Sequence, residues 1–245
     1  MTSEPAERFA LVVPTLNESG NIRRVLEQIV GALSSLPLQW EIIVVDDNST
    51  DGTADLVRAF AASERRIRLS IRESQRGLSG AIIHGWAQTH AELLGVIDAD
   101  LQHPPEVLPS LLAAMQNGAD IAIASRYLRP NSMDGWNPIR KVLSRISVWA
   151  STPLQRREAR ARDPLSGFFV VRHACIEGIE FQKTGFKLLL EVLAKGRIKS
   201  VAEIPFRFAT RERGVSKANA MTGVYYLSLL LKLSFNRRTR TESRG

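Results

Sequence analysis

Three oxygen-bearing side chains, Asp98, Asp100 and Gln102, stand two residues apart directly after the apolar run 93–97. The run has the length and composition of a short buried strand, and a strand directs alternate side chains to one side. Two carboxylates and an amide oxygen that converge in this way can bind Mg²⁺ or Mn²⁺, which usually keep water and substrate phosphate as further ligands. The spacing therefore predicts a metal-diphosphate site; the alternative is a solvated loop with two incidental acids.

Two further polar segments, 14–20 and 46–53, each lie between an apolar run and a helical pattern. Such segments line the carboxyl edge of a parallel sheet, where a carboxylate can accept hydrogen bonds from a base edge or a ribose hydroxyl. Asp46 and Asp47 alone are weak evidence, because acidic residues are common in turns. Together with the cluster at 98–102 they favour a ligand site.

Motifs of other nucleotide-binding classes are missing from the chain. It contains neither G-x-G-x-x-G nor a P-loop, so neither a dinucleotide enzyme nor a P-loop NTPase is favoured. The segment Gly77-Leu-Ser-Gly80 allows two interpretations, a close approach of the backbone to another group or an ordinary helix start.

The elements that must position these side chains alternate between strand and helix in the first half of the chain. Apolar, β-prone runs predict strands at 9–13, 41–45, 67–71, 93–97 and 121–124. Apolar residues at helical spacing predict helices at 22–36 with Asn21 as cap, from Thr53 onward, at 78–90 and at 105–116. Repeated β-α-β units imply an α/β fold, a parallel sheet with helices on both faces.

The second half is less regular. The patterns predict helices at 136–152 and 184–194, strands at 168–171 and 200–205, and a charged loop at 156–162. An apolar helix is expected at 221–235, either lying on a bilayer or partner or covering the domain's own core.

Composition fits one globular unit that lies in the cytoplasm or on a membrane surface. A chain of 245 residues with 44% hydrophobic residues can bury a full core. Its one cysteine, Cys175, excludes an intrachain disulfide. The first residues do not resemble a signal peptide, and no stretch approaches the roughly 20 apolar residues of a spanning helix.

The net charge of +8 is unevenly distributed. Residues 1–125 carry 9 basic and 16 acidic side chains, whereas residues 126–162 and 207–245 each carry 9 basic and 2 acidic ones. An acidic half with metal-ligand chemistry followed by two basic segments suits anionic substrates or an anionic membrane surface. Nucleic acid is the rival partner, but no recognition motif supports it.

Several motifs in order carry a family resemblance. The chain resembles family 2 glycosyltransferases with the GT-A fold, and among them the dolichol-phosphate (polyprenyl-phosphate) mannose synthases. The matching segments cover about residues 9–219 and are Val13–Glu18, Val45–Thr53, Gly77–Ala81, Asp98–Glu106, Ser125–Tyr127, Asp163–Phe168, Glu191 and Arg211–Lys217. The resemblance implies a GT-A, Rossmann-like catalytic domain at 1–220, followed by an apolar and then basic tail at 221–245.

The resemblance also assigns roles to individual residues. It implies a nucleoside site formed by Pro14, Leu16, Glu18, Asp46 and Asp47, and places Asp98 against the nucleotide sugar as well. The implied ligands of Mg²⁺ or Mn²⁺ are Asp98, Asp100 and Gln102. The implied phosphate-binding residues are Arg126, Arg140, Arg211 and Lys217, and the residues expected to matter most for catalysis are Asp100, Arg126 and Arg140.

The implied reaction moves a hexose, in the first place mannose from GDP-mannose, to a polyprenyl (dolichyl) phosphate with inversion. A phosphate acceptor is largely ionised at neutral pH, since its second pKa is about 6, and therefore needs no protein base. The expected partners are a membrane surface on its cytoplasmic face and a separate anchoring subunit, without nucleic acid.

Two alternatives remain. A related enzyme could use UDP-glucose or UDP-GlcNAc, or a saccharide acceptor whose hydroxyl needs a base, with Asp163 or Glu191 as candidates. A basic membrane- or RNA-binding module without activity is the non-enzymatic alternative.

Overall fold

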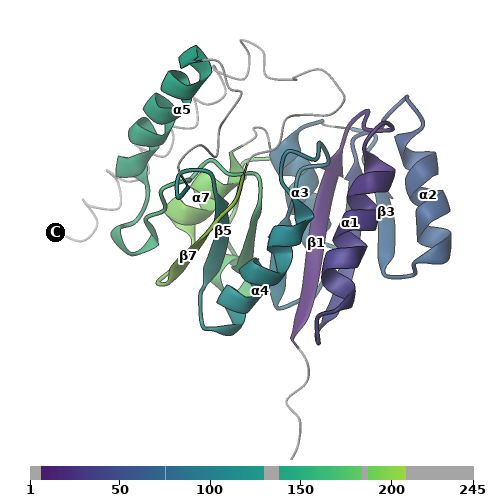
Figure 1. Ribbon diagram of the computed structural model, residues 1–245, viewed down its shortest axis with the longest axis horizontal. Coiled ribbons are helices and arrows are strands. Elements are labelled where there is room, and N and C mark those ends of the chain that lie inside the picture. The colour runs from purple at the N-terminus through teal and green to yellow at the C-terminus, as the bar shows by residue number, and fades with distance from the viewer. Residues whose placement is uncertain (1–6, 75, 130–137, 184–186, 208–245) are drawn as a thin grey trace, which may run out of the picture.

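The computed structural model describes residues 7–74, 76–129, 138–183 and 187–207, and these form one mixed sheet covered by helices on both faces (Figure 1). The strand order is β3-β2-β1-β4-β6-β5-β7. The strands are β1 (Arg8–Thr15), β2 (Gln39–Asp46), β3 (Ile67–Ile71), β4 (Leu93–Val96), β5 (Ile121–Ser125), β6 (Phe169–Arg172) and β7 (Val201–Pro205). The helices are α1 (Ile22–Ser34), α2 (Thr53–Ser63), α3 (Leu78–Trp86), α4 (Leu108–Gln116), α5 (Pro138–Ser151), α6 (His173–Ile176) and α7 (Leu188–Lys195).

Alternation along β1 explains the two helical layers. Phe9 and Leu11 face the layer that contains α1 and α4, whereas Ala10 and Val12 face the layer that contains α3 and α7. Because both faces are covered, the strand is apolar at every one of these positions rather than at alternate ones. The parallel pairing of β1 with β2 and β4, and of β2 with β3, confirms the fold expected from the β-α-β pattern.

One strand departs from the parallel arrangement. β6 lies between β4 and β5 and runs antiparallel to both. Hydrophobic periodicity cannot reveal strand direction, because a buried strand is equally apolar in either sense. Its insertion brings residues 163–168 to the end of β4, next to the polar segment that begins at Asp98.

Several element boundaries differ from the sequence-based expectation. α3 ends at Trp86 rather than at residue 90, and the chain turns after it. The Trp86 indole Nε1 donates to the Gly95 carbonyl and so attaches the end of the helix to β4. The helix expected at 105–116 starts as a 3₁₀ turn at Pro105–Val107. α7 starts at Leu188, and a 3₁₀ turn and α6 occur where no helix was expected, at Arg157–Ala159 and His173–Ile176. The expected helix at 221–235 lies outside the described residues.

The parallel strands β1 and β4 are neighbours, so their carboxyl ends lie side by side. From β1 the sheet extends through β2 to β3 in one direction, and from β4 it extends through β6 and β5 to β7 in the other. The segments after these two strands therefore start side by side. Ligands of open α/β sheets bind at such a reversal of strand order. The fold thus places the segments 14–20 and 98–102 at one edge of the sheet.

Gly95 in the middle of β4 provides a test of this packing. A Cβ at Gly95 would lie 2.7 Å from Cε2 of Phe9 and 2.9 Å from Cδ1 of Leu11, so Gly95→Ala should destabilise the protein by about 1–3 kcal/mol through overpacking. Gly31→Ala in α1 is the matched control: a Cβ there meets nothing within 4 Å, and alanine should gain about 0.5–1 kcal/mol. Urea unfolding measures both, and equal stability of the two variants would contradict the packing described.

Candidate active site

The segment 98–102 forms a tight turn after β4. Leu101 adopts φ +59°, a left-handed conformation that is uncommon for a residue other than glycine and is found where surrounding structure enforces it. The backbone N–H of Gln102 donates to Oδ1 of Asp100 at 3.1 Å. Asp100 is only 8% exposed, whereas the carboxylate of Asp98 is more open. The turn therefore holds the two acids and Gln102 together at the sheet edge.

Asp98 is supported on one side by residues of the matching segments 98–106 and 163–168 to which the sequence analysis gave no individual role. A Cβ on Gly167 would overlap Oδ2 of Asp98, so the carboxylate rests directly on the backbone before β6. Nδ1 of the buried His103 lies 3.6 Å from the same oxygen. The His103 ring packs against Phe168 and Phe206, with centroids 6.0 and 5.4 Å away. Burial lowers the pKa of His103 to about 4, so the imidazole beside Asp98 is neutral at physiological pH.

A buried ion pair lies next to this carboxylate. Arg126, which directly follows β5, donates from Nε and Nη2 to the two carboxylate oxygens of Asp163 at 2.7 Å each, and its backbone N–H donates to Asp163 at 3.0 Å. Burial disfavours the cation, but the hydrogen bonds that Arg126 donates to Asp163, together with the negative charge of Asp163, outweigh burial and raise the pKa of Arg126. Arg126 lies directly after a strand at the sheet edge, as expected from the sequence. Its pairing with Asp163 was not predicted.

Lys187 supplies a second cation at the same place. It precedes α7, and its charge interacts with Arg126, Asp163 and Asp98. Burial, followed by the nearby guanidinium of Arg126, lowers the pKa of Lys187 to about 8, which leaves the amine mostly protonated at neutral pH. A lysine just ahead of a helix carries no sequence signal for this role, because only the folded chain brings it to β4 and β5.

The segments 14–20 and 46–53 are fastened to each other. Asp46 is buried and accepts hydrogen bonds from the Thr15 hydroxyl and from the hydroxyl and backbone N–H of Ser49, at 2.6–2.8 Å. The backbone N–H of Ser19 donates to Asp51 at 2.9 Å. The buried Asp46 and the more exposed Asp51 therefore both hold the shape of the predicted nucleoside site.

Asp47 connects this edge to the start of α3. Its Oδ2 accepts the N–H of Gly77 at 2.8 Å, and its Oδ1 lies 3.1 Å from Nη1 of Arg72. A Cβ on Gly80 would come within 2.7 Å of the Lys183 carbonyl. Both interpretations of Gly77–Gly80 therefore hold: α3 begins at Leu78, directly after Gly77, and the group that approaches Gly80 closely is the protein's own backbone.

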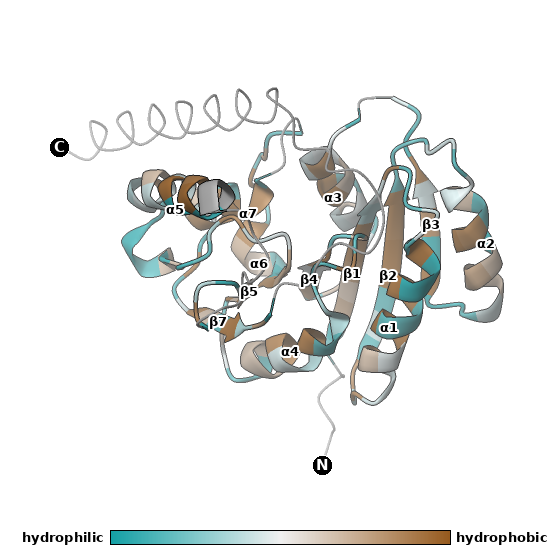
Figure 2. Cartoon of the chain, turned by 45° about the horizontal axis from the view of Figure 1, so that its top comes forward, coloured by the Kyte–Doolittle hydropathy of each residue, from teal (hydrophilic) through white to brown (hydrophobic). Residues whose placement is uncertain are grey.

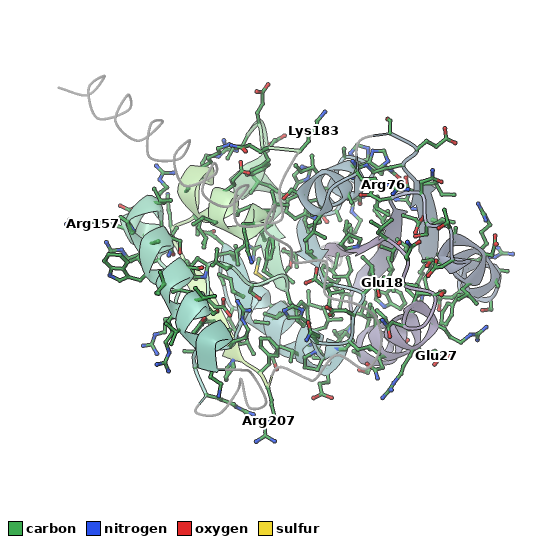
Figure 3. The ribbon with its side chains drawn as sticks, turned by 90° about the horizontal axis from the view of Figure 1, so that it is seen from above. Glu18, Glu27, Arg76, Arg157, Lys183 and Arg207 are labelled. Atoms are coloured by element: carbon green, nitrogen blue, oxygen red, sulfur yellow. The ribbon has the colours of Figure 1, made fainter. Side chains whose placement is uncertain are left out.

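The other predicted site residues are distributed as follows. Pro14 is buried at the end of β1, and the next residue but one, Leu16, is half-buried. Glu18 is labelled in Figure 3, which views the molecule from above, and it accepts a hydrogen bond from the Asn21 side chain at 2.9 Å. That bond replaces the helix cap expected from Asn21. Arg140 belongs to the first turn of α5, but its side chain, together with Arg211 and Lys217, lies outside the described part of the chain.

The two candidate bases are both engaged in the interior. Besides the pairing of Asp163 with Arg126, the buried Glu191 accepts the backbone N–H of Gln182 at 3.1 Å and lies 2.7 Å from Nζ of Lys195. Each carboxylate thus already has a cationic side chain of the protein as its partner. The geometry therefore disfavours a reaction that needs either of them as general base.

The donor set fits a divalent cation that shares its coordination shell with a ligand. Among the described residues no three His, Cys, Asp or Glu side chains gather into a metal cluster. Two carboxylates and an amide oxygen leave positions for phosphate and water, which is how Mg²⁺ is usually bound. Arg126 and Lys187 lie on the same side as Asp98 and would meet the remaining charge of a diphosphate.

Comparison with known proteins gives consistent matches. The model of Glycosyl transferase family 2 matches residues 10–177. A dolichol-phosphate mannosyltransferase of Pyrococcus furiosus is 38% identical over 226 residues, which are 92% of this chain and 63% of that longer protein. A polyprenol monophosphomannose synthase of Mycolicibacterium smegmatis is 35% identical over 225 residues, 88% of this chain and 83% of the relative.

A solved structure shares the fold. Glucosyl-3-phosphoglycerate synthase from Mycobacterium tuberculosis, crystallised with Mn²⁺, UDP-glucose and phosphoglyceric acid, superposes with a TM-score of 0.70 at 21% identity. The match covers 93% of this chain and 80% of that one. At this identity the likeness concerns the architecture alone.

The contact between Gly167 and Asp98 leads to the first prediction for this site. Gly167→Ala should displace the Asp98 carboxylate and weaken Mn²⁺ binding in the presence of a nucleoside diphosphate by about tenfold or more, as expected when a metal ligand loses its support. Calorimetric titration measures this affinity. Gly31→Ala, which meets no neighbouring atom, should bind Mn²⁺ normally. Unchanged affinity in Gly167→Ala would show that Asp98 does not ligate the metal.

The second prediction concerns Asp51 and acid stability. Partial burial opposes its ionisation, but hydrogen bonds from Thr53 and Ser19 outweigh burial and lower its pKa from 3.8 to about 2. A lowered pKa stabilises the fold above the unfolded-state value, and this contribution disappears as pH falls from about 4 to 2. Asp51→Asn should make the unfolding free energy less pH-dependent in that window, as measured by urea titration at several pH values. The same dependence on pH in Asp51→Asn as in the unaltered protein would contradict this account.

Proposed function

Because the chain belongs to glycosyl transferase family 2, we propose that it transfers mannose from GDP-mannose to a polyprenyl phosphate. The names of its relatives support mannose as the sugar and a polyprenyl or dolichyl phosphate as the acceptor. The observation that carries the proposal is the turn at 98–102, where the charge of Asp98 interacts with the cations Arg126 and Lys187. This combination suits a metal-bound diphosphate and an anionic acceptor together.

On the donor side, Asp98, Asp100 and Gln102 would hold Mg²⁺ or Mn²⁺ against the diphosphate. The bound metal neutralises charge on the departing nucleoside diphosphate. The chain's own residues fix where this happens: Leu101 shapes the turn, and Gly167 with the neutral His103 supports Asp98. Asp47 and Glu18, near the start of α3 and α1, would contact the nucleoside.

On the acceptor side, a phosphate oxygen attacks the anomeric carbon while the bond from that carbon to the donor diphosphate breaks. The acceptor is already ionised, so no proton has to leave it, and in-line attack inverts the anomeric configuration. This is consistent with the engagement of Asp163 and Glu191 inside the protein. Arg126, Arg140, Arg211 and Lys217 would bind the acceptor phosphate. Arg140 and Arg211 could each contact two of its oxygens, whereas Lys217 would act as a point charge and Arg126, whose Nε and Nη2 donate to Asp163, would contribute chiefly its charge.

The proposed acceptor requires access to a membrane. None of the helices in the described part of the chain is long and apolar enough to cross a bilayer. We propose that the protein works at the cytoplasmic face of a membrane, held there peripherally or through a separate anchoring subunit.

A transfer assay tests the proposal. The purified chain with Mn²⁺ should form a lipid-linked sugar from GDP-mannose and a short polyprenyl phosphate, but not from UDP-glucose or UDP-GlcNAc. Chelation of the metal should abolish transfer, and Asp100→Asn should lower kcat/KM by a factor on the order of 10² or more. Asp55→Asn on the surface of α2 is the matched control and should retain full activity.

Two results would contradict the proposal. Labelling of a soluble saccharide without labelling of the polyprenyl phosphate would assign the chain to another acceptor class. Full turnover in Asp100→Asn would mean that the chemistry takes place away from the turn at 98–102.

A further inference from the structure

His103 is a polar ring in a hydrophobic environment. It lies on the connection between β4 and α4, and 5% of its surface is exposed. Figure 2 shows α4 as a largely hydrophobic helix. A polar ring that is buried in such surroundings loses its hydration, and an apolar ring would fill the same space without this loss. The imidazole is therefore expected to serve through its nitrogens as well as through its packing.

Two aromatic side chains set the orientation of the imidazole. Phe168, directly before β6, meets the ring edge-on, with a centroid distance of 6.0 Å and an interplanar angle of 75°. Phe206, directly after β7, lies at a centroid distance of 5.4 Å with the rings tilted by 34°. Close packing on both rings restricts rotation of the imidazole. The nitrogen that faces Asp98 is therefore fixed by packing, and it is Nδ1, 3.6 Å from Oδ2 of the carboxylate.

The position of the ring proton follows from this contact. A neutral imidazole carries one N–H and one lone pair. A lone pair on Nδ1 would face the negative oxygen of Asp98, and repulsion between such groups is strong in a buried site. With the proton on Nδ1 the same contact is attractive, and an approach of about 0.5 Å brings the two atoms into hydrogen-bond range. The geometry therefore favours the tautomer that carries its proton on Nδ1.

A neutral donor has an advantage over a cation at this carboxylate. The positive charges of Arg126 and Lys187 also interact with Asp98, and each of them would repel a divalent cation bound to the same oxygens. A neutral N–H orients the carboxylate without adding a positive charge. Hydrogen bonds from outer-shell residues orient metal ligands in this way, and their loss typically lowers metal affinity by about 10–100-fold.

We propose that His103 is a positioning residue, whose Nδ1–H donates a hydrogen bond to Asp98 and holds that carboxylate in the orientation that ligates Mg²⁺ or Mn²⁺. The inference rests on the proposed function in taking Asp98 as a metal ligand. The ring acts through Asp98 alone, touches neither the sugar donor nor the acceptor, and keeps its proton throughout the reaction.

Two substitutions separate the hydrogen bond from the packing. His103→Phe keeps an aromatic ring between Phe168 and Phe206 but has no N–H. His103→Asn lacks the ring but carries an N–H donor as many bonds from Cα as Nδ1. We expect His103→Phe to bind Mn²⁺ in the presence of GDP at least about tenfold more weakly, with no loss of thermal stability. His103→Asn should unfold at a lower temperature, because it leaves a cavity, yet bind Mn²⁺ nearly normally.

Calorimetric titration with Mn²⁺ and GDP, together with thermal unfolding, measures both properties. His173→Phe is the matched control. His173 follows β6 at the end that pairs with the start of β4, and therefore lies at the opposite edge of the sheet from Asp98. This control should bind Mn²⁺ normally.

Nitrogen NMR of the metal-free protein reports the ring proton directly. The chain contains four histidines, and the signals of His103 are those that disappear in His103→Phe. The shifts of its two ring nitrogens should identify Nδ1 as the protonated one. A role limited to packing would not select either tautomer through Asp98.

The outcomes distinguish this inference from the proposed function. If metal affinity follows stability, with His103→Phe binding normally and His103→Asn binding weakly, packing is the whole role of His103 and the inference is overturned. A proton on Nε2 would overturn it as well. If Mn²⁺ binding depends on the Nδ1 donor as expected but no prenyl phosphate accepts a sugar, the positioning role stands and the proposed reaction fails.

Discussion

The ion pair between Arg126 and Asp163 is the interaction on which the site depends. It joins the end of β5 to the segment that leads into β6, and this segment contains Gly167, the backbone support of Asp98. Removing one partner would leave an uncompensated buried charge, a loss of about 3–5 kcal/mol. Pairing with β4 and β5 holds the antiparallel β6, and the ion pair fixes the loop before it, through which Gly167 reaches Asp98.

The parts of the fold that were predictable from the sequence are those encoded locally. Apolar runs that end in acidic segments indicated β1, β2 and β4, and the β-α-β repeat indicated which edge the acidic segments share. The positions of Asp98, Asp100 and Arg126 followed from this. The direction of β6 did not follow, because strand direction depends on connections between distant segments. Gly167 and His103 lie in the matching segments but received no role of their own, and Lys187 was missed, because only the folded chain shows which residues contact or face Asp98.

Residue type alone also left the roles of neighbouring acids unresolved. Asp46 and Asp47 are adjacent and chemically identical, yet Asp46 is enclosed by Thr15 and Ser49, whereas Asp47 holds the start of α3 through Gly77 and Arg72. Both residues stabilise the conformation of this sheet edge. They contact different partners because successive side chains at the end of β2 point to opposite sides. The sequence can therefore locate an acidic site more readily than it can assign a role to each acidic residue in it.

Leu101 has a consequence for how the protein would fail on heating. Its left-handed backbone is unfavourable for leucine, yet its side chain is 9% exposed and belongs to the same core cluster as Phe168 and Val107. The turn from Asp98 to Gln102 is not free to change conformation while the hydrophobic core stays packed, because the Leu101 side chain is part of that core. Thermal inactivation should consequently coincide with cooperative melting of the whole domain, with no inactive but still folded species preceding it.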